Sequence, residues 1–94
     1  MGKTSNRGFT AKKATLVLRQ NIARNLRELR ELHDESQAKA AKRIGTSPGM
    51  VSLLERAGRD PTLHLLTRIA KAYETTVVQL LRTYDIEKAS EARQ

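Results

Sequence analysis

Apolar residues recur every three or four positions through the first third of the chain, which is the spacing of one face of an α-helix. The series starts just after Thr10, a residue type that favours the position before a helix. Its members are Ala11, Ala14, Leu18, Ile22, Leu26, Leu29 and Leu32. The pattern predicts one long helix, or two joined ones, preceded by a flexible basic arm at residues 1–9.

Two short helices are predicted next, and a serine opens each of them. Ser36 precedes a helix that Gly45 ends, because glycine takes the left-handed conformation without steric cost. Ser47 and Pro48 open the second helix, since proline needs no backbone N–H at the first helical position. This helix is expected to reach about Glu55, and its buried residues are expected to be Val51 and Leu54, with Met50 at the edge.

The remaining pattern predicts a loop at residues 56–61 and two more helices. Thr62 would cap a helix whose apolar face is Leu63, Leu66, Ile69, Ala70 and Tyr73, and Thr76 would cap a last one holding Val77, Leu80 and Leu81. The fold class is therefore all-α, a compact bundle of five helices. One domain is expected at residues 10–85, followed by a charged C-terminal tail at residues 86–94.

Composition narrows the class of protein. A chain of 94 residues supports a single core, and an aromatic content of 3% means that aliphatic side chains must build it. With no cysteine, disulfides and thiolate metal sites are excluded, which fits a cytoplasmic protein. No apolar stretch approaches the ~20 residues that span a bilayer, so no membrane association is expected.

The net charge of +8 is unevenly distributed. Residues 1–59 hold thirteen Lys or Arg against five Asp or Glu, whereas residues 60–94 hold five of each. A concentrated positive charge favours a polyanionic partner, although a basic surface also keeps a small protein in solution.

Two short helices joined by a three-residue turn have the spacing of a helix-turn-helix, here at about residues 36–55. The sequence also resembles the lambda-repressor-like helix-turn-helix domains of the Cro/C1 and xenobiotic-response-element type, from about Ile22 to Leu81. The residues that carry the resemblance are Leu26, Leu29, Arg30, Ser36, Gln37, Ala41, Gly45, Ser47, Val51, Ser52, Glu55, Gly58, Pro61, Leu66, Ile69, Ala70, Leu80 and Leu81. It implies a five-helix transcriptional regulator that binds double-stranded DNA as a homodimer.

The resemblance also implies roles for particular residues. The DNA base-facing positions would be Gln37, Ser47, Pro48, Gly49, Ser52 and Leu53. Arg30 and Glu55 match a partly buried ion pair that ties the first helix to the recognition helix. The side chains flanking the groove-facing surface, which would contact phosphates, are Ser36, Lys39, Lys42, Arg43, Arg56 and Arg59. Since few of the base-facing residues form bidentate contacts with purines, specificity is expected to depend on DNA shape and water as well.

The basic N-terminal residues suggest a second contact. Lys3, Arg7, Lys12 and Lys13 would form an arm along the duplex or in its minor groove, or else a flexible tail without a defined contact.

The sequence departs from the family pattern in the core and in one loop. Asp34 and Glu35 stand where the family has Gly-Leu, and Ala40 replaces a leucine, so the core is expected to be thinner there, with Leu32 compensating. Gly58 comes one residue later than the family's glycine, which suggests a longer loop.

The sequence offers little support for catalysis and leaves two other binding functions open. His33 and His64 have no ligand spacing, and the chain has no glycine-rich phosphate loop, so no enzyme activity, cofactor or metal is expected. The alternatives are a module that docks a protein partner and a non-specific DNA-coating protein. An outward-facing apolar patch at Val78, Leu81, Tyr84 and Ile86 would favour partner docking, but it could equally be the interface of a DNA-binding dimer.

Overall fold

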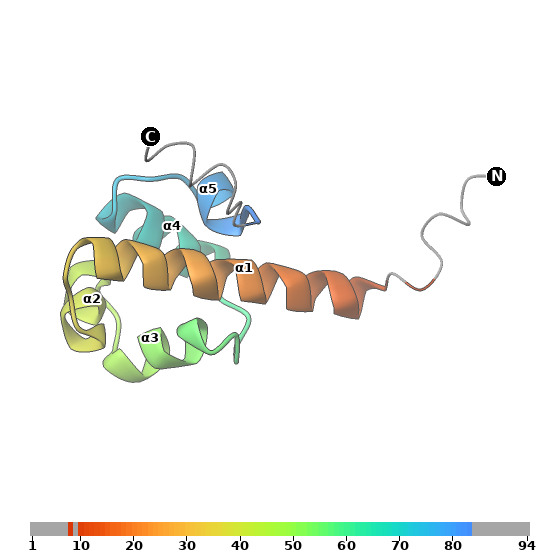
Figure 1. The fold of residues 1–94 in the computed structure, drawn as a ribbon, viewed down its shortest axis with the longest axis horizontal. Coiled ribbons are helices and arrows are strands. Elements are labelled where there is room, and N and C mark those ends of the chain that lie inside the picture. Colours follow the sequence, from red (N-terminus) through yellow and green to blue (C-terminus); the bar gives the residue numbers. More distant parts are fainter. Residues whose placement is uncertain (1–7, 9, 84–94) are drawn as a thin grey trace.

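The computed structural model describes residue 8 and residues 10–83, and all of the regular structure in this part of the chain is helical (Figure 1). The helices are α1 (Ala11–Leu32), α2 (Gln37–Ile44), α3 (Pro48–Glu55), α4 (Leu63–Ala72) and α5 (Val77–Leu81). The predicted all-α fold with five helices is confirmed, and α1 is one continuous helix. The expected basic arm at residues 1–9 lies outside the described residues apart from Gly8, and the expected charged tail lies wholly outside them. Lys12 and Lys13, which the sequence placed in the same arm, lie in the first turn of α1.

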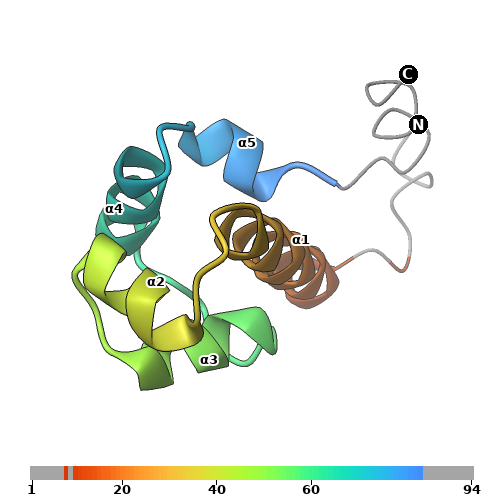
Figure 2. The same cartoon turned by 60° about the vertical axis from the view of Figure 1, so that its left-hand side comes forward.

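Helix α1 runs through the middle of the bundle. Figures 1 and 2 show α2 and α3 on one side of it and α4 and α5 on the other, so that α3 and α5 lie on opposite sides of α1. The first half of α1 projects beyond the other helices (Figure 1).

Every helix begins at the predicted serine or threonine. In each case the side-chain oxygen accepts a hydrogen bond from the backbone N–H three residues later, which satisfies a group that the helix itself leaves unpaired. The caps are Thr10, Ser36, Ser47, Thr62 and Thr76.

The first four helices end in a reversal with one residue in the left-handed conformation. That residue is Gly45 after α2, but it is Asp34 after α1, Ala57 after α3 and Glu74 after α4. A side chain at such a position costs about 1–2 kcal/mol. At the end of α3 the backbone N–H of Gly58 donates to the carbonyl of Leu53 at 2.9 Å, so the reversal is closed although its left-handed residue is an alanine.

Replacing Ala57 by glycine is expected to stabilise the protein by about 0.5–1 kcal/mol, because the relief of the left-handed strain exceeds the added entropy of the unfolded chain. The free energy of unfolding in urea measures it. The matched change Ala14→Gly, inside α1, should cost about 1 kcal/mol instead. Destabilisation by both changes would show that the turn after α3 carries no strain.

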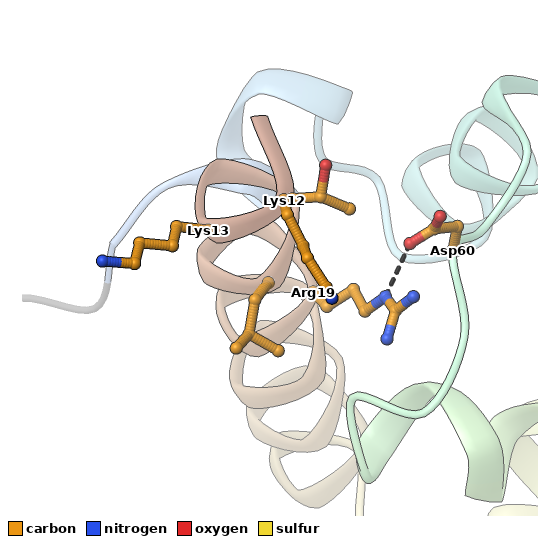
Figure 3. A pocket seen from close by; sticks show the side chains of 6 residues that line it. Lys12, Lys13, Arg19 and Asp60 are labelled. Carbon is orange, nitrogen blue, oxygen red and sulfur yellow. Dashed lines mark hydrogen bonds and ion pairs between the residues drawn. The ribbon is translucent and has the colours of Figure 1, made fainter. Parts of the chain in front are cut away.

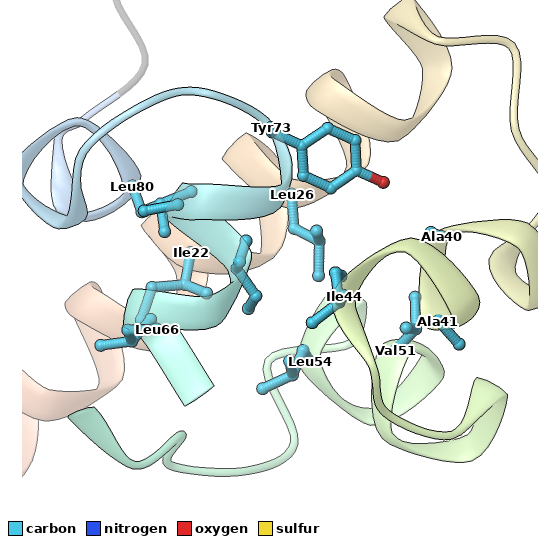
Figure 4. Packing of buried hydrophobic residues seen from close by; sticks show 12 residues of the cluster. Ile22, Leu26, Ala40, Ala41, Ile44, Val51, Leu54, Leu66, Tyr73 and Leu80 are labelled. Atoms are coloured by element: carbon cyan, nitrogen blue, oxygen red, sulfur yellow. The ribbon is translucent and has the colours of Figure 1, made fainter. Parts of the chain in front are cut away.

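The core lies between the five helices, each of which contributes buried side chains to it (Figure 4). Its most buried large side chains are Leu26, Leu54, Ile69, Leu80 and Val51, and Tyr73 joins them at 5% exposure.

Four apolar positions that the pattern placed on a buried face are exposed, namely Ala11 and Leu18 in the first half of α1, Leu32 at its end, and Leu63 in α4. Leu32 is 76% exposed because it lies in the last turn of α1, where the chain has begun to turn toward α2, so it does not compensate for Ala40. Leu63 is 77% exposed at the first position of α4. Leu32 and Leu63 lie at helix ends, where helical periodicity continues but no neighbouring helix covers the side chain. Ala11 and Leu18 lie in the half of α1 that projects beyond the other helices.

Polar side chains of the longer helices bind the ends of the shorter ones. The amide of Asn25 donates to the carbonyls of Leu80 and Arg82 at 2.8 and 2.9 Å, and so holds the end of α5 against α1. Arg68 of α4 donates to the carbonyl of Gly45 at the end of α2. These contacts satisfy carbonyl groups that the helices leave free.

Candidate nucleic-acid interface

Helices α2 and α3 and the turn between them form the predicted motif. The turn runs from Gly45, whose φ of 87° lies in the left-handed region, to Ser47. The Ser47 hydroxyl accepts from the backbone N–H of Met50 at 3.1 Å, and Pro48 occupies the start of α3. The local sequence therefore sets where the second helix of the motif begins.

Helix α3 has one buried face and one outer face. Val51 and Leu54 are almost fully buried in the core. The outer face consists of exposed Pro48 and Gly49 and half-buried Ser52 and Leu53, with the exposed cap Ser47 at its start. These are the base-facing positions that the sequence predicted, and no described part of the chain covers Pro48 or Gly49.

Glu55 joins three helices at the inner end of α3. Its carboxylate, only 4% exposed, accepts two hydrogen bonds from Arg30, at 2.7 and 3.1 Å. It also accepts one from the Gln37 amide at 3.0 Å. The ion pair implied by the resemblance is thus present, and the hydrogen bonds that Arg30 donates to Glu55 raise the pKa of Arg30 above its ordinary value.

Gln37 occupies a position that sequence reasoning did not foresee. Its side chain is half-buried and its amide nitrogen donates inward to Glu55, which leaves the amide oxygen as an acceptor. A contact between Gln37 and DNA would therefore use the amide oxygen, because the amide nitrogen is bound to Glu55.

Arg27 adds a second tie to the same helix end. Its guanidinium donates at 2.6 Å to the backbone carbonyl of Glu55, the last residue of α3. Periodicity placed Arg27 on the polar side of α1 but gave no signal of this partner, because the contact depends on how the two helices cross.

Four of the predicted phosphate-binding side chains are exposed on α2 and on the loop that follows α3. Lys39 and Lys42 are exposed on α2 and line, with Pro48, a shallow hollow of about 390 Å³. Arg56 and Arg59 are exposed on the loop that follows α3. Ser36 is also exposed, and its hydroxyl is engaged as the cap of α2.

Arg43 has a different set of partners. Its guanidinium lies 2.7 Å from the Glu35 carboxylate and 5.2 Å from the centre of the Tyr73 ring. It also donates to the carbonyl of Ala72 at 3.4 Å, so it joins α2 to the end of α4. This orientation distinguishes it from the phosphate-binding candidates Lys39 and Lys42 on the same helix.

Glu35 is the centre of a second polar cluster. Beside the Arg43 pair, it accepts a hydrogen bond from the Tyr73 hydroxyl at 2.8 Å. The hydrogen bond from Arg43 lowers the pKa of the Glu35 carboxyl, while burial raises the pKa of the Tyr73 hydroxyl well above its ordinary value. The departure from the family's leucine therefore introduces a bound carboxylate at the edge of the core.

Two further findings are negative. In the described residues no group of three or more His, Cys, Asp or Glu side chains has the arrangement of a metal site. None of the helices described is both long enough and apolar enough to cross a membrane.

The fold and the exposed face of α3 define a helix-turn-helix domain of the DNA-binding class. The chain belongs to the Cro/C1-type helix-turn-helix family, whose model, described as helix-turn-helix, matches residues 26–80. As a member of this family it is a DNA-binding regulator and not an enzyme.

Two solved structures are similar to the chain. A hypothetical transcription factor, NHTF, from Neisseria has 27% identity and a TM-score of 0.67, over 80% of this chain and 84% of that one. An HTH_3 family transcriptional regulator from Vibrio cholerae has 27% identity and a TM-score of 0.65, over 70% of this chain and 37% of that one. None of the curated proteins compared with the chain gives a significant match.

Proposed function

We propose that the protein is a cytoplasmic, sequence-specific transcriptional regulator that places the outer face of α3 in the major groove of double-stranded DNA. The observation that carries this proposal is the contrast between the two faces of α3. Glu55 and Arg27 fix the inner end of the helix to α1, while Pro48 and Gly49 stay exposed. An α-helix presented in this way matches the width of the major groove.

Base contacts are assigned to the outer face of α3 and its cap. Ser47 and Ser52 offer hydroxyl groups, Leu53 offers an apolar contact to a thymine methyl, and Pro48 and Gly49 allow close approach of the backbone. Gln37 contributes the amide oxygen that its bond to Glu55 leaves free.

Phosphate contacts are assigned to Lys39, Lys42, Arg56, Arg59 and the Ser36 cap. Arg43 is left out because its guanidinium is bound to Glu35 and Tyr73. Since phosphate contacts position a protein without reading sequence, these residues set affinity more than specificity.

A homodimer is part of the proposal, because one short recognition helix reads only a few base pairs. Val78 of α5 is 69% exposed and half-buried Leu81 lies on the same short helix, and these residues would form the contact between subunits. The other two residues of the predicted patch, Tyr84 and Ile86, lie outside the described residues. The same apolar residues favour the alternative, in which the domain docks a protein partner.

Binding to duplexes at several salt concentrations tests the proposal. The protein is expected to prefer a duplex from its own upstream region over a scrambled duplex, and its affinity should fall steeply as salt rises. Equal affinity for both duplexes would indicate a non-specific coating protein. No binding in dilute buffer would indicate the protein-docking alternative.

Two substitutions separate the assigned roles. Arg56→Ala is expected to weaken binding to all duplexes by a similar factor and to reduce the salt slope by about one. Leu53→Ser should instead change the order of preference among duplexes, by roughly tenfold for the base pair that it contacts. Electrophoretic mobility shifts with a panel of single-base variants measure both, and Lys71→Ala on α4 is the control. A uniform loss for Leu53→Ser would place that residue outside the groove.

A further inference from the structure

Two adjoining hollows lie along the first half of α1. One has a volume of about 470 Å³ and is lined by Lys12, Lys13, Thr15, Leu16, Arg19 and Asp60 (Figure 3). The other, of about 220 Å³, includes Leu18, Leu63 and Leu81 in its wall. Thr15, Arg19 and Asp60 line both hollows, so together they form one groove between α1 and the start of α4, here called the α1 groove.

The wall of the α1 groove is apolar and accessible. Leu16 and Leu18 are 47% and 43% exposed, and Leu63 is exposed at the groove's other side. Leucine side chains gathered in this way favour an apolar occupant.

The rim of the groove is basic. Lys12 and Lys13 are exposed, and the carboxylate of Asp60 lies 2.6 Å from the Arg19 guanidinium, so this acid is already neutralised (Figure 3). An occupant that suits both wall and rim carries apolar side chains next to carboxylates. A second copy presenting the same face would bring its own lysines against these, which disfavours a face-to-face pair.

The chain itself has such a segment close by. Residues 84–87 read Tyr-Asp-Ile-Glu, alternating apolar and acidic side chains without a base among them. Leu81 is already part of the groove wall, and three residues of extended chain span about 10 Å. A short tether of this kind gives an effective concentration in the millimolar range, so that even weak docking is populated.

We propose that the segment of residues 84–87 docks in the α1 groove of its own chain, with Tyr84 and Ile86 against the leucines and Asp85 and Glu87 toward Lys12 and Lys13. The groove's α1 residues and this segment both lie outside residues 26–80, where the family model matches. The interaction would therefore be a feature of this chain added to the family domain.

Spin labelling tests the proposal, because the sequence has no cysteine and Ser90→Cys gives a single attachment site. A nitroxide there is expected to broaden the backbone amide signals of Leu16, Leu18 and Leu63 in the ¹⁵N-labelled full chain. Signals of Leu32, exposed at the opposite end of α1, should keep their intensity. Equal intensities at both ends of α1 would overturn the proposal.

A mixed sample separates docking within one chain from docking between two. Spin-labelled protein without ¹⁵N is combined with ¹⁵N-labelled protein that has no spin label. Docking within the chain predicts no broadening in this mixture, whereas broadening of the groove signals would show exchange between copies and overturn the assignment.

Paired variants show whether the stated side chains are responsible. Tyr84→Ser combined with Ile86→Ser should restore the groove signals in the spin-labelled chain, and Leu32→Ser should leave the broadening unchanged. Persistent broadening in the double variant would overturn the proposed contacts. No DNA is present in these measurements, so their outcome is independent of the proposed DNA binding. Docking of Tyr84 and Ile86 in the groove would remove these two residues from the proposed contact between subunits.

Discussion

Replacing Glu55 by alanine is expected to lower the free energy of unfolding by about 3–5 kcal/mol, because it leaves a partly buried guanidinium without its partner. Arg30 is only 17% exposed and would lose both of its bonds to the carboxylate. Gln37 would lose its acceptor as well. Since small domains are stable by about 5–15 kcal/mol, such a loss is a large share of the total. Urea unfolding followed by circular dichroism measures it.

An apolar pair in place of the ion pair identifies the cause. The double variant Arg30→Met with Glu55→Leu buries no unpaired charge, so it is expected to recover most of the lost stability. Its affinity for duplex DNA should nevertheless stay below that of the natural protein, because the bonds that orient α3 against α1 and α2 are gone. Glu31→Ala, an exposed acid on α1, should change stability by less than about 0.5 kcal/mol. If the double variant is as unstable as Glu55→Ala, lost packing rather than an unpaired charge explains the effect.

The helices and their beginnings could be predicted from the sequence because each start is a local event. A serine or threonine oxygen bonds a backbone N–H three residues away, so Ser47 and Thr62 act within their own segments. The outer face of α3 follows from the same local logic, once Val51 and Leu54 are assigned to the core.

Contacts between helices could not be predicted in this way. Arg27, Asn25 and Arg68 all bind the free carbonyls at the end of another helix, and the partner depends on how two helices cross. A polar residue on an amphipathic helix gives no sequence signal of such a contact, because a solvated side chain would show the same pattern. The Arg30–Glu55 ion pair also joins two helices, and it could be predicted because the family resemblance implies it.

The substitution of Glu35 for an apolar residue had a different outcome from the one expected. The sequence suggested a thinner core filled by Leu32, but the structure leaves Leu32 exposed and uses Tyr73 and Arg43 instead. The His33 ring also packs edge-on against Tyr73, with 5.1 Å between ring centres. The hydrogen-bonded cluster of Glu35, Tyr73 and Arg43 replaces the aliphatic contact of the family's leucine. Hydrophobic periodicity alone does not predict such a cluster.

Replacing Glu35 by alanine is accordingly expected to cost about 2–3 kcal/mol at neutral pH, since hydrogen bonds to charged groups contribute more than neutral ones. The Tyr73 hydroxyl would remain buried without its acceptor, and Arg43 would lose its ion-pair partner. Tyr73→Phe removes the buried hydroxyl itself, so no donor is left without an acceptor. It should therefore lower the stability less than Glu35→Ala does. Thermal unfolding of the three proteins measures the order.

The pH dependence of the same cluster has a definite sign. Because Arg43 lowers the folded-state pKa of Glu35 below its ordinary value of 4.5, the stabilisation is fully present above that value. It is lost as the pH falls through the lowered pKa of the folded state. The natural protein should therefore exceed Glu35→Gln in stability at neutral pH, and the difference should disappear in acid. A gap between the natural protein and Glu35→Gln that stays constant from neutral pH into acid would show that the charge of Glu35 contributes nothing.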